Sequence, residues 1–282
     1  MNINATTKIF GIFGHPVSHS LSPVMHNNAF EMLNLNCVYV AFDIQPDDLE
    51  SATSAIRTLG IRGINVTIPH KEKIISFIDE ISPEATLTGA INTIINDDGK
   101  LTGYNTDVGG FLRAINDDLE INPKGSRVFL LGAGGAARAV LTALCMKEAK
   151  EIYIINRTFE KAKSLASEFK KHFAQMSIFP YSLDERQAVE NSLKSSDLLV
   201  NATSSGMEGI RSIDLKLELL PKKSKIYDLV YKPRKTVLIK NAKQLGLRAA
   251  GGLSMLLYQG AESFEIWTGE DAPIEVMRKA IE

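Results

Sequence analysis

The 282-residue sequence is poor in cysteine and in net charge, and each shortage excludes a class of protein. Its two cysteines, Cys37 and Cys145, lie far apart and belong to no C-x-x-C or histidine-rich pattern. They therefore predict neither a disulfide framework nor a metal site. The 32 basic and 33 acidic side chains leave a formal net charge of −1, which provides no field to attract nucleic acid or an anionic membrane. We therefore expect a small-molecule partner, and neither nucleic acid nor a membrane.

The sequence also lacks the patterns of a signal peptide and of a membrane-spanning segment. Residues 1–8 have no basic region followed by an apolar core, so we expect a cytoplasmic location. The apolar stretch of residues 128–146 contains a glycine turn and Arg138, and it predicts a strand followed by a helix rather than a membrane span. With 44% hydrophobic and 23% charged residues, the composition is that of an ordinary globular protein, and the length allows two domains.

Strand-length apolar runs alternate with helix-length amphipathic segments, which is the pattern of an α/β fold with largely parallel sheets. One series of strands is predicted near residues 8–13, 38–44, 63–68, 91–95 and 101–104. A second series is predicted near residues 127–131, 151–155, 177–180, 197–201, 225–230 and 247–249.

The polar connector of residues 117–125 separates the two series and indicates two domains. We predict an N-terminal α/β domain of residues 1–107 and a doubly wound, Rossmann-like domain of residues 108–249. Two final helical segments, 253–267 and 273–281, exceed what a nucleotide-binding unit needs. We therefore expect residues 250–282 to pack back on the first domain.

A glycine turn follows the first strand of the second series. Gly132, Gly134 and Ala137 fit the pattern G-x-G-x-x-G/A. The first glycine makes a tight turn, the second lets the backbone approach a pyrophosphate, and the small residue permits close helix packing. The helix N-terminus then faces the anion. Because such a turn also occurs for packing alone, the motif by itself leaves both interpretations open.

The end of the next strand indicates which dinucleotide binds. NAD-preferring enzymes place an acidic residue there to bind the ribose 2′-hydroxyl, whereas this strand ends with Asn156-Arg157-Thr158. Arg157 would suit a 2′-phosphate, so we predict NADP. Thr158 is a natural N-cap for the following helix, and a bound phosphate would relieve the unfavourable position of Lys161 in the first turn of that helix. In the alternative interpretation, Arg157 and Lys161 are solvated surface cations.

Three serines follow the first strand of the chain. In an extended backbone, the hydroxyls of Ser18 and Ser20 would point the same way and could grip a carboxylate. Ser22 is expected to be the N-cap of the next helix, with Pro23 at the first helical position. In the alternative interpretation, which the residues alone favour, all three serines are loop and capping residues.

Other strands of the first domain also carry polar residues toward their ends. Asn65 and Thr67 share one face of the strand near 63–68, and Asn92 lies early in the strand near 91–95. Polar groups at such positions commonly reach into a binding cleft.

A lysine and an aspartate stand out beside these residues. Lys71 follows a proline where a helix is expected to begin, and a lysine there could transfer a proton. Asp107 follows the strand near 101–104 and could hold the ammonium group in place. The alternatives are an exposed helix lysine and a simple helix N-cap.

Together these motifs resemble those of the shikimate dehydrogenase family, and the resemblance runs through nearly the whole chain. The matching segments are residues 18–23, 65–71, 89–93, 103–107, 132–137, 156–158, 201–207 and 255–259. The resemblance implies a two-domain enzyme that interconverts 3-dehydroshikimate and shikimate with NADPH and NADP, in the shikimate pathway to chorismate and aromatic amino acids. It also implies an active site between the domains. We expect a monomer or a homodimer.

The resemblance assigns roles to individual residues. Lys71 and Asp107 would form the catalytic pair, in which Lys71 protonates the developing alkoxide and Asp107 positions it. Substrate would be bound by Ser18 and Ser20 at the carboxylate, with Tyr231 assisting, and at the ring hydroxyls by Thr67, Asn92, Asp107 and Gln259. The cofactor would be bound by Gly132, Ala133, Gly134, Gly135, Ala136, Asn156, Arg157, Thr158, Lys161, Thr203, Leu229, Gly252 and Met255.

Two other functions remain open. A paralogue could act on quinate or on an amino-substituted ring and could use NAD, although Arg157 argues against NAD. A non-catalytic, NADP-binding regulatory protein could also keep this fold, although the intact Lys71 and Asp107 argue against it.

Overall fold

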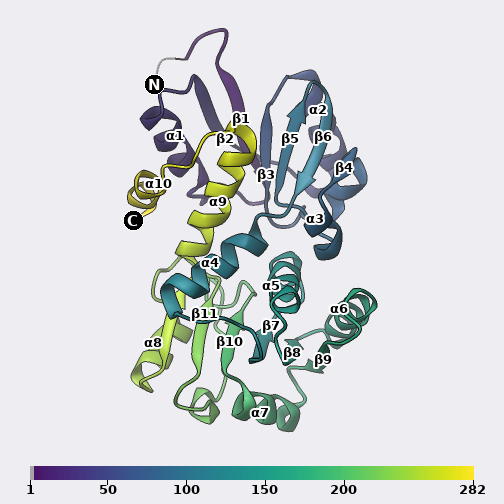
Figure 1. Cartoon of the computed structure of the whole chain (residues 1–282), viewed down its shortest axis with the longest axis vertical. Coiled ribbons are helices and arrows are strands. Elements are labelled where there is room, and N and C mark those ends of the chain that lie inside the picture. The colour runs from purple at the N-terminus through teal and green to yellow at the C-terminus, as the bar shows by residue number, and fades with distance from the viewer. Residues whose placement is uncertain (1–2) are drawn as a thin grey trace. The chain divides into compact units, whose positions relative to one another are not determined.

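The computed structural model describes residues 3–282 and divides the chain into two compact units. The first unit comprises the chain up to Gly110 together with Leu256–Glu282, and the second comprises Phe111–Met255. Both units are α/β units, as the alternation of apolar runs predicts (Figure 1).

Within the described residues, the first unit holds one six-stranded sheet of order β2-β1-β3-β5-β6-β4. Its strands are β1 (Lys8–Gly14), β2 (Cys37–Asp43), β3 (Gly63–Val66), β4 (Glu80–Ile81), β5 (Thr93–Asp97) and β6 (Lys100–Tyr104). Five of the six lie at predicted positions, and the two-residue strand β4 was not predicted.

The expectation of largely parallel pairing holds only in part for this sheet, because three of its five pairs, β4 with β6 among them, are parallel and two are antiparallel. β1 pairs in parallel with β2 and β3, but β5 pairs antiparallel with β3 and β6. β5 and β6 pair antiparallel because the two-residue turn Asp98-Gly99 joins them, and both of its residues have positive φ, 48° and 94°. This combination makes a tight hairpin with the twist that antiparallel strands need.

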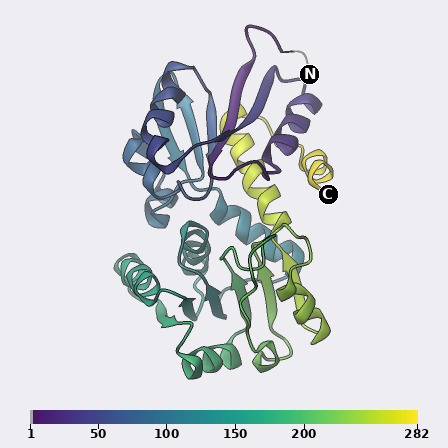
Figure 2. The ribbon, with the colours of Figure 1, turned by 180° about the vertical axis from the view of Figure 1, so that it is seen from behind.

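Helices cover both faces of this sheet. They are α1 (Ser22–Met32), α2 (Leu49–Thr58), α3 (Pro83–Thr88), the start of α4 (Asp107–Leu119), most of α9 (Leu253–Thr268) and α10 (Ile274–Ile281). α2 and α9 lie on opposite faces, as the two opposite views show (Figures 1 and 2). α10 packs against α1, so the last helices return to the first unit as predicted.

Two predicted helix starts need correction. α1 begins at Ser22 and its N-cap is Leu21, so Ser22 is the first helical residue rather than the cap. The helix expected near Lys71 is only a five-residue 3₁₀ helix, Lys73–Phe77, because β4 follows at Glu80 and leaves no room for a longer one. Two further short 3₁₀ helices are Pro46–Asp48 and Leu217–Leu219.

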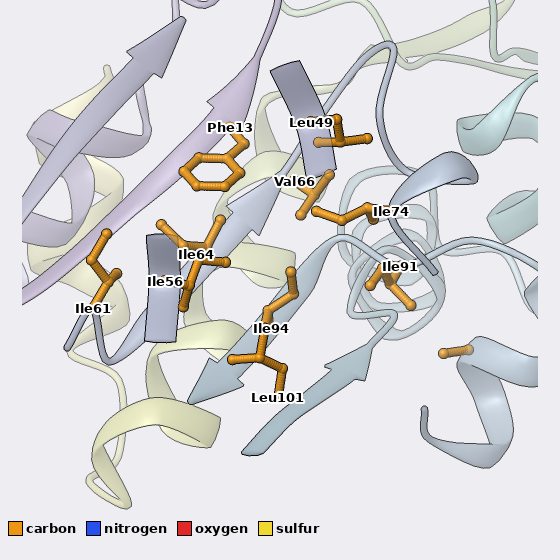
Figure 3. Packing of buried hydrophobic residues seen from close by; sticks show 11 residues of the cluster. Phe13, Leu49, Ile56, Ile61, Ile64, Val66, Ile74, Ile91, Ile94 and Leu101 are labelled. Atoms are coloured by element: carbon orange, nitrogen blue, oxygen red, sulfur yellow. The ribbon is translucent and has the colours of Figure 1, made fainter. Parts of the chain in front are cut away.

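The two faces of the first sheet hold different cores. On one face, Leu49 and Ile56 of α2 pack against strand residues (Figure 3). The labelled core residues in that view are Phe13, Leu49, Ile56, Ile61, Ile64, Val66, Ile74, Ile91, Ile94 and Leu101. On the other face, Phe10 contacts Phe30 of α1 and Trp267 of α9. Burial of these side chains supplies the main driving force for folding of the unit.

Within the described residues, the second unit holds one six-stranded sheet of order β12-β11-β10-β7-β8-β9, and every pair in it is parallel. Its strands are β7 (Arg127–Leu131), β8 (Glu151–Asn156), β9 (Ser177–Ser182), β10 (Leu198–Asn201), β11 (Lys225–Asp228) and β12 (Arg248–Gly251). This order is the doubly wound arrangement that reverses between β7 and β10, where such folds bind ligands. It confirms the Rossmann-like prediction.

The connecting helices of this unit are α5 (Gly135–Met146), α6 (Phe159–His172), α7 (Arg186–Ser195) and α8 (Val237–Gln244). Val189 and Leu193 of α7 and Ala242 of α8 share one core with Phe129 and Ile226 of the sheet. The apolar stretch of residues 128–146 is β7 followed by α5, as predicted. Throughout the part of the chain that the structure describes, no helix is long and apolar enough to cross a membrane.

Candidate active site

A buried ion pair joins Lys71 and Asp107 in the first unit. Lys71 Nζ donates a hydrogen bond to Asp107 Oδ2, and the two side chains are only 14% and 7% exposed. The Lys71 carbonyl accepts from the backbone N–H of Ile91 at 2.9 Å, which ties this loop to the segment before β5. Asp107 is the first residue of α4, and its carboxylate is directed to Lys71 rather than to the N–H groups of the helix.

Asn92 organises this pair. It lies directly before β5 rather than within that strand, and it is almost completely buried. Its Nδ2 donates to Asp107 Oδ1 at 3.0 Å and to Gln259 Oε1 at 3.2 Å, while its Oδ1 accepts from the backbone N–H of Thr106 at 2.8 Å. The amide therefore holds the second oxygen of Asp107 and connects it to α9. Four residues predicted for the site, Lys71, Asn92, Asp107 and Gln259, thus form one connected group.

A layer of buried hydroxyls lies behind Asn92. Ser263 Oγ is 2.7 Å from Thr93 Oγ1 and 3.2 Å from Thr106 Oγ1. Asn65 Nδ2 donates to Ser263 Oγ at 3.0 Å, and Asn65 Oδ1 accepts from Tyr39 Oη at 2.7 Å. Asn65 is therefore engaged inside the protein rather than free for a ligand. Sequence reasoning missed Thr93, Thr106 and Ser263, because nothing in the local pattern shows that α9 returns beside residues so distant in sequence.

The serines after β1 lie in a loop and at a helix start, as the interpretation favoured by the residues alone predicts, and not in an extended backbone. Ser18 and His19 lie in a turn, and the Ser20 N–H bonds the Val17 carbonyl at 3.0 Å, so the backbone is not extended there. Ser20 Oγ accepts from the N–H of Ser22 at 3.2 Å, at the start of α1, and can still donate its proton. Ser18 is exposed and Ser20 is half-buried.

Thr67 stands directly after β3 and is half-buried. Its N–H bonds the Phe13 carbonyl at 2.9 Å, which fixes it beside the end of β1. Its methyl group lies 2.4 Å from where a Cβ would project from Gly14, so this close approach requires glycine at residue 14.

In the second unit, the predicted cofactor residues follow the carboxyl ends of parallel strands. Gly132 follows β7, Thr203 follows β10, Leu229 follows β11 and Gly252 follows β12. Gly132 has a φ of 115°, which favours glycine, and a Cβ there would lie 3.0 Å from the Thr203 methyl group. A Cβ on Gly252 would lie 2.0 Å from the Leu229 carbonyl oxygen. Gly132 therefore packs closely against Thr203, and Gly252 packs closely against Leu229.

The start of α5 suits a phosphate group. Gly134 is the N-cap and supplies no side-chain hydrogen bond, so the first N–H groups of the helix have no cap. A Cβ placed on Gly134 would meet no atom within 4 Å. Open space beside free N–H groups at a helix N-terminus is the arrangement that binds anions.

Two cations stand at the end of β8 and the start of α6. Arg157 and Lys161 are exposed, and no ion pair involves either of them in the described residues. Thr158 is the N-cap of α6, as predicted, but without a side-chain hydrogen bond. Asn156 Nδ2 donates to the Thr158 carbonyl at 2.9 Å and fixes the turn. Exposed cations beside a helix N-terminus are suited to binding a phosphate group.

A buried carboxylate holds the loops after β10 and β11. Asp228 Oδ1 accepts from Asn201 Nδ2 at 2.8 Å, and Asp228 Oδ2 accepts from Thr236 Oγ1 at 2.6 Å. Asn201 Oδ1 accepts from the Thr203 hydroxyl at 2.7 Å. Burial raises the pKa of Asp228, although these hydrogen bonds oppose the rise. Sequence reasoning missed Asn201 and Asp228 as positioning residues, although a polar residue at the end of an apolar strand was the available signal.

The remaining predicted residues lie in the second unit. Tyr231 follows β11 and is half-buried, and burial raises the pKa of its phenol. Met255, in the first turns of α9, is buried.

Comparison with known proteins places this geometry in a family. A model of the shikimate dehydrogenase substrate-binding domain matches residues 12–94, and a model of shikimate/quinate 5-dehydrogenase matches residues 115–229. A model of the shikimate 5-dehydrogenase C-terminal domain matches residues 252–282. A shikimate dehydrogenase (NADP(+)) of Desulforamulus reducens is 43% identical over 99% of this chain and 96% of its own length. The chain belongs to the shikimate dehydrogenase family.

Solved structures of shikimate dehydrogenases agree with this membership. One in complex with NADP+ is 43% identical and covers 99% of this chain and 96% of its own, with a TM-score of 0.90. The Thermus thermophilus enzyme in complex with NADP(H) and shikimate is 39% identical and covers 97% of this chain and 98% of its own, with a TM-score of 0.86. A quinate dehydrogenase from Corynebacterium glutamicum in complex with NAD is 29% identical and covers 97% of this chain and 98% of its own, with a TM-score of 0.88.

Proposed function

We propose that this member of the shikimate dehydrogenase family interconverts 3-dehydroshikimate and shikimate with NADPH and NADP, a step toward chorismate and the aromatic amino acids. The observation that carries the proposal is the buried pair of Lys71 and Asp107, joined through Asn92 to Gln259. The family membership supplies the substrate class.

Lys71 is proposed as the proton donor and acceptor. In the reducing direction, its ammonium group donates a proton from Nζ to the alkoxide that develops on the substrate, and its positive charge stabilises that oxyanion. Asp107 accepts one hydrogen bond from Lys71 and thereby directs the remaining N–H groups. Because both side chains are largely buried, bulk water competes little for this proton. General acid–base help of this kind is typically worth about 10²–10⁴ in rate.

The substrate is proposed to lie against polar residues of the first unit. The resemblance assigns its carboxylate to Ser18 and Ser20, with Tyr231 assisting. Thr67, Asn92, Asp107 and Gln259 bind its ring hydroxyls. For Ser20 this contact is compatible with its cap-like role, because its oxygen accepts from Ser22 while its proton stays free to bind a carboxylate.

The second unit is proposed to bind the cofactor, which supplies or accepts the hydride when it is bound. Residues 132–136 and the start of α5 hold the pyrophosphate, and Asn156, Arg157, Thr158 and Lys161 hold the 2′-phosphate. Thr203, Leu229, Gly252 and Met255 lie toward the nicotinamide. The uncapped helix and the two cations without ion pairs in the described residues support this assignment.

The proposal is tested by absorbance at the reduced-nicotinamide band after the purified protein is mixed with shikimate and NADP. Parallel arms replace shikimate by quinate and NADP by NAD. We expect fast reduction of NADP with shikimate and weak signals elsewhere. Activity mainly with quinate or NAD would instead make the chain the paralogue represented by the Corynebacterium enzyme, and no activity in any arm would favour a regulatory role. A cytoplasmic location and a monomeric or dimeric state remain predictions.

A further inference from the structure

A third carboxyl group, that of Glu262, lies beside the first turn of α4, the helix that carries Asp107. Glu262 stands three residues after Gln259 on α9, so the two side chains share one face of the helix. Its Oε2 lies 2.5 Å from where a Cβ would project from Gly109, which is two residues beyond Asp107 in α4. The missing side chain at Gly109 therefore leaves the space that the Glu262 carboxyl occupies beside the first turn of α4.

The charged neighbours that raise the pKa of Glu262 are acidic. They come from three elements: Glu84 on α3, Glu265 on α9 and Asp107 on α4. No ion pair links Glu262 to a cation anywhere in residues 3–282. Burial, followed by these neighbouring carboxylates, raises the pKa of Glu262 to about 7. Glu262 therefore changes its charge near neutral pH.

We propose that Glu262 is a positioning residue of the catalytic site, which acts through its charge on Asp107 and, through Asp107, on Lys71. This inference rests on the proposed function. Asp107 already balances the ammonium group of Lys71, so an ionised Glu262 gives the site a net negative charge. The proposed substrate is an anion, and its reacting oxygen becomes more negative in the transition state. The neutral form of Glu262 is therefore the more active one, and ionisation lowers kcat/KM.

The test compares Glu262→Gln with the wild type across pH. Glutamine keeps the shape of neutral glutamic acid and cannot ionise, so the variant mimics the neutral form at every pH. We divide kcat/KM of the variant by kcat/KM of the wild type. This ratio should be constant below about pH 6 and reach a second plateau, about threefold higher, above about pH 8, with its midpoint near 7. The ratio cancels ionisations that both proteins share. A smaller folded fraction in the variant would lower this ratio by the same factor at all pH values.

Two further variants separate charge from structure. Glu262→Asp keeps an ionisable group and should give a much flatter ratio. Glu275→Gln removes an exposed carboxyl of α10 that does not act on Glu262, and its ratio should be flat. A flat ratio for Glu262→Gln in an active enzyme would overturn this inference alone. A wild type that does not oxidise shikimate with NADP would overturn the proposed function, and this inference with it.

Discussion

Replacing Lys71 by methionine and Asp107 by asparagine, singly and together, separates the catalytic from the structural contribution of this pair. Methionine keeps most of the length of lysine without its charge. Asparagine keeps an oxygen that can accept from Asn92, as Asp107 does at 3.0 Å. The four proteins therefore form a double-mutant cycle with little change in packing.

The expected stabilities follow from burial. Unit charges about 4 Å apart attract by about 4 kcal/mol at the effective dielectric of a protein, and removal of water from both groups offsets much of this. A single substitution leaves one largely buried charge without its partner and should lower the free energy of unfolding by about 3 kcal/mol. The double variant removes both charges and should lose less than either single variant. Urea denaturation followed by Trp267 fluorescence measures this, because Trp267 is the only tryptophan of the chain and lies in the same unit as the pair.

The expected activities follow a different rule. Each single variant should lose about 10²–10⁴ in kcat for shikimate oxidation. The double variant should lose no more than the worse single one, because groups that act as a unit are not additive. The reasoning would be refuted if kcat of a single variant stayed within a few-fold of the wild-type value. It would also be refuted if the loss of kcat in the double variant equalled the product of the two single losses.

Three further outcomes are expected elsewhere in the chain. Arg157→Ala should raise KM for NADP about tenfold and leave KM for NAD unchanged, since the lost contact is with the 2′-phosphate. Initial-rate measurements test this, and equal changes in the two KM values would argue against that role. Burial lowers the pKa of His26 to about 3, and neither ring nitrogen has a hydrogen-bond partner. The unfolded chain therefore binds the proton first, and stability is lost as the pH falls below about 6.5, by about 2 kcal/mol between pH 7 and 5. His26→Phe should abolish this part of the pH dependence in urea titrations, and unchanged curves would contradict it. Asp228→Asn should destabilise the protein by about 1–3 kcal/mol, because an amide cannot accept all the hydrogen bonds of the buried carboxylate; an unchanged denaturation midpoint would count against this.

The sequence predicted the second sheet better than the first for a physical reason. A parallel sheet covered by helices on both faces needs continuous apolar strands, and Ile152 to Ile155 is such a run. In the first sheet, the pairing direction of β5 and β6 depends on the turn Asp98-Gly99 rather than on the apolar pattern. That turn signal was present in the sequence, and the expectation of parallel pairing overlooked it.

The candidate site was predictable where its residues belong to short local motifs. Lys71 and Asp107 were identified in this way, and the structure places them in contact. The hydroxyl layer behind Asn92 was not identified, because Ser263 reaches Asn65 from a helix 198 residues further along the chain. The extended alternative for Ser18 and Ser20 is wrong, because their turn depends on a backbone hydrogen bond to Val17 that a residue pattern does not specify.

The two units build their sites by different means, and this explains why the glycines of the second unit are hard to interpret from sequence. In the first unit, side chains fix one another, so each position depends on its neighbours in space. In the second unit, the main contribution is the absence of side chains. A Cβ on Gly252 would collide with the Leu229 carbonyl, so packing alone requires glycine there. A Cβ on Gly134 would meet no protein atom within 4 Å, so packing does not account for that glycine. The proposed approach of a phosphate to the start of α5 would account for it, and only the structure distinguishes these two cases.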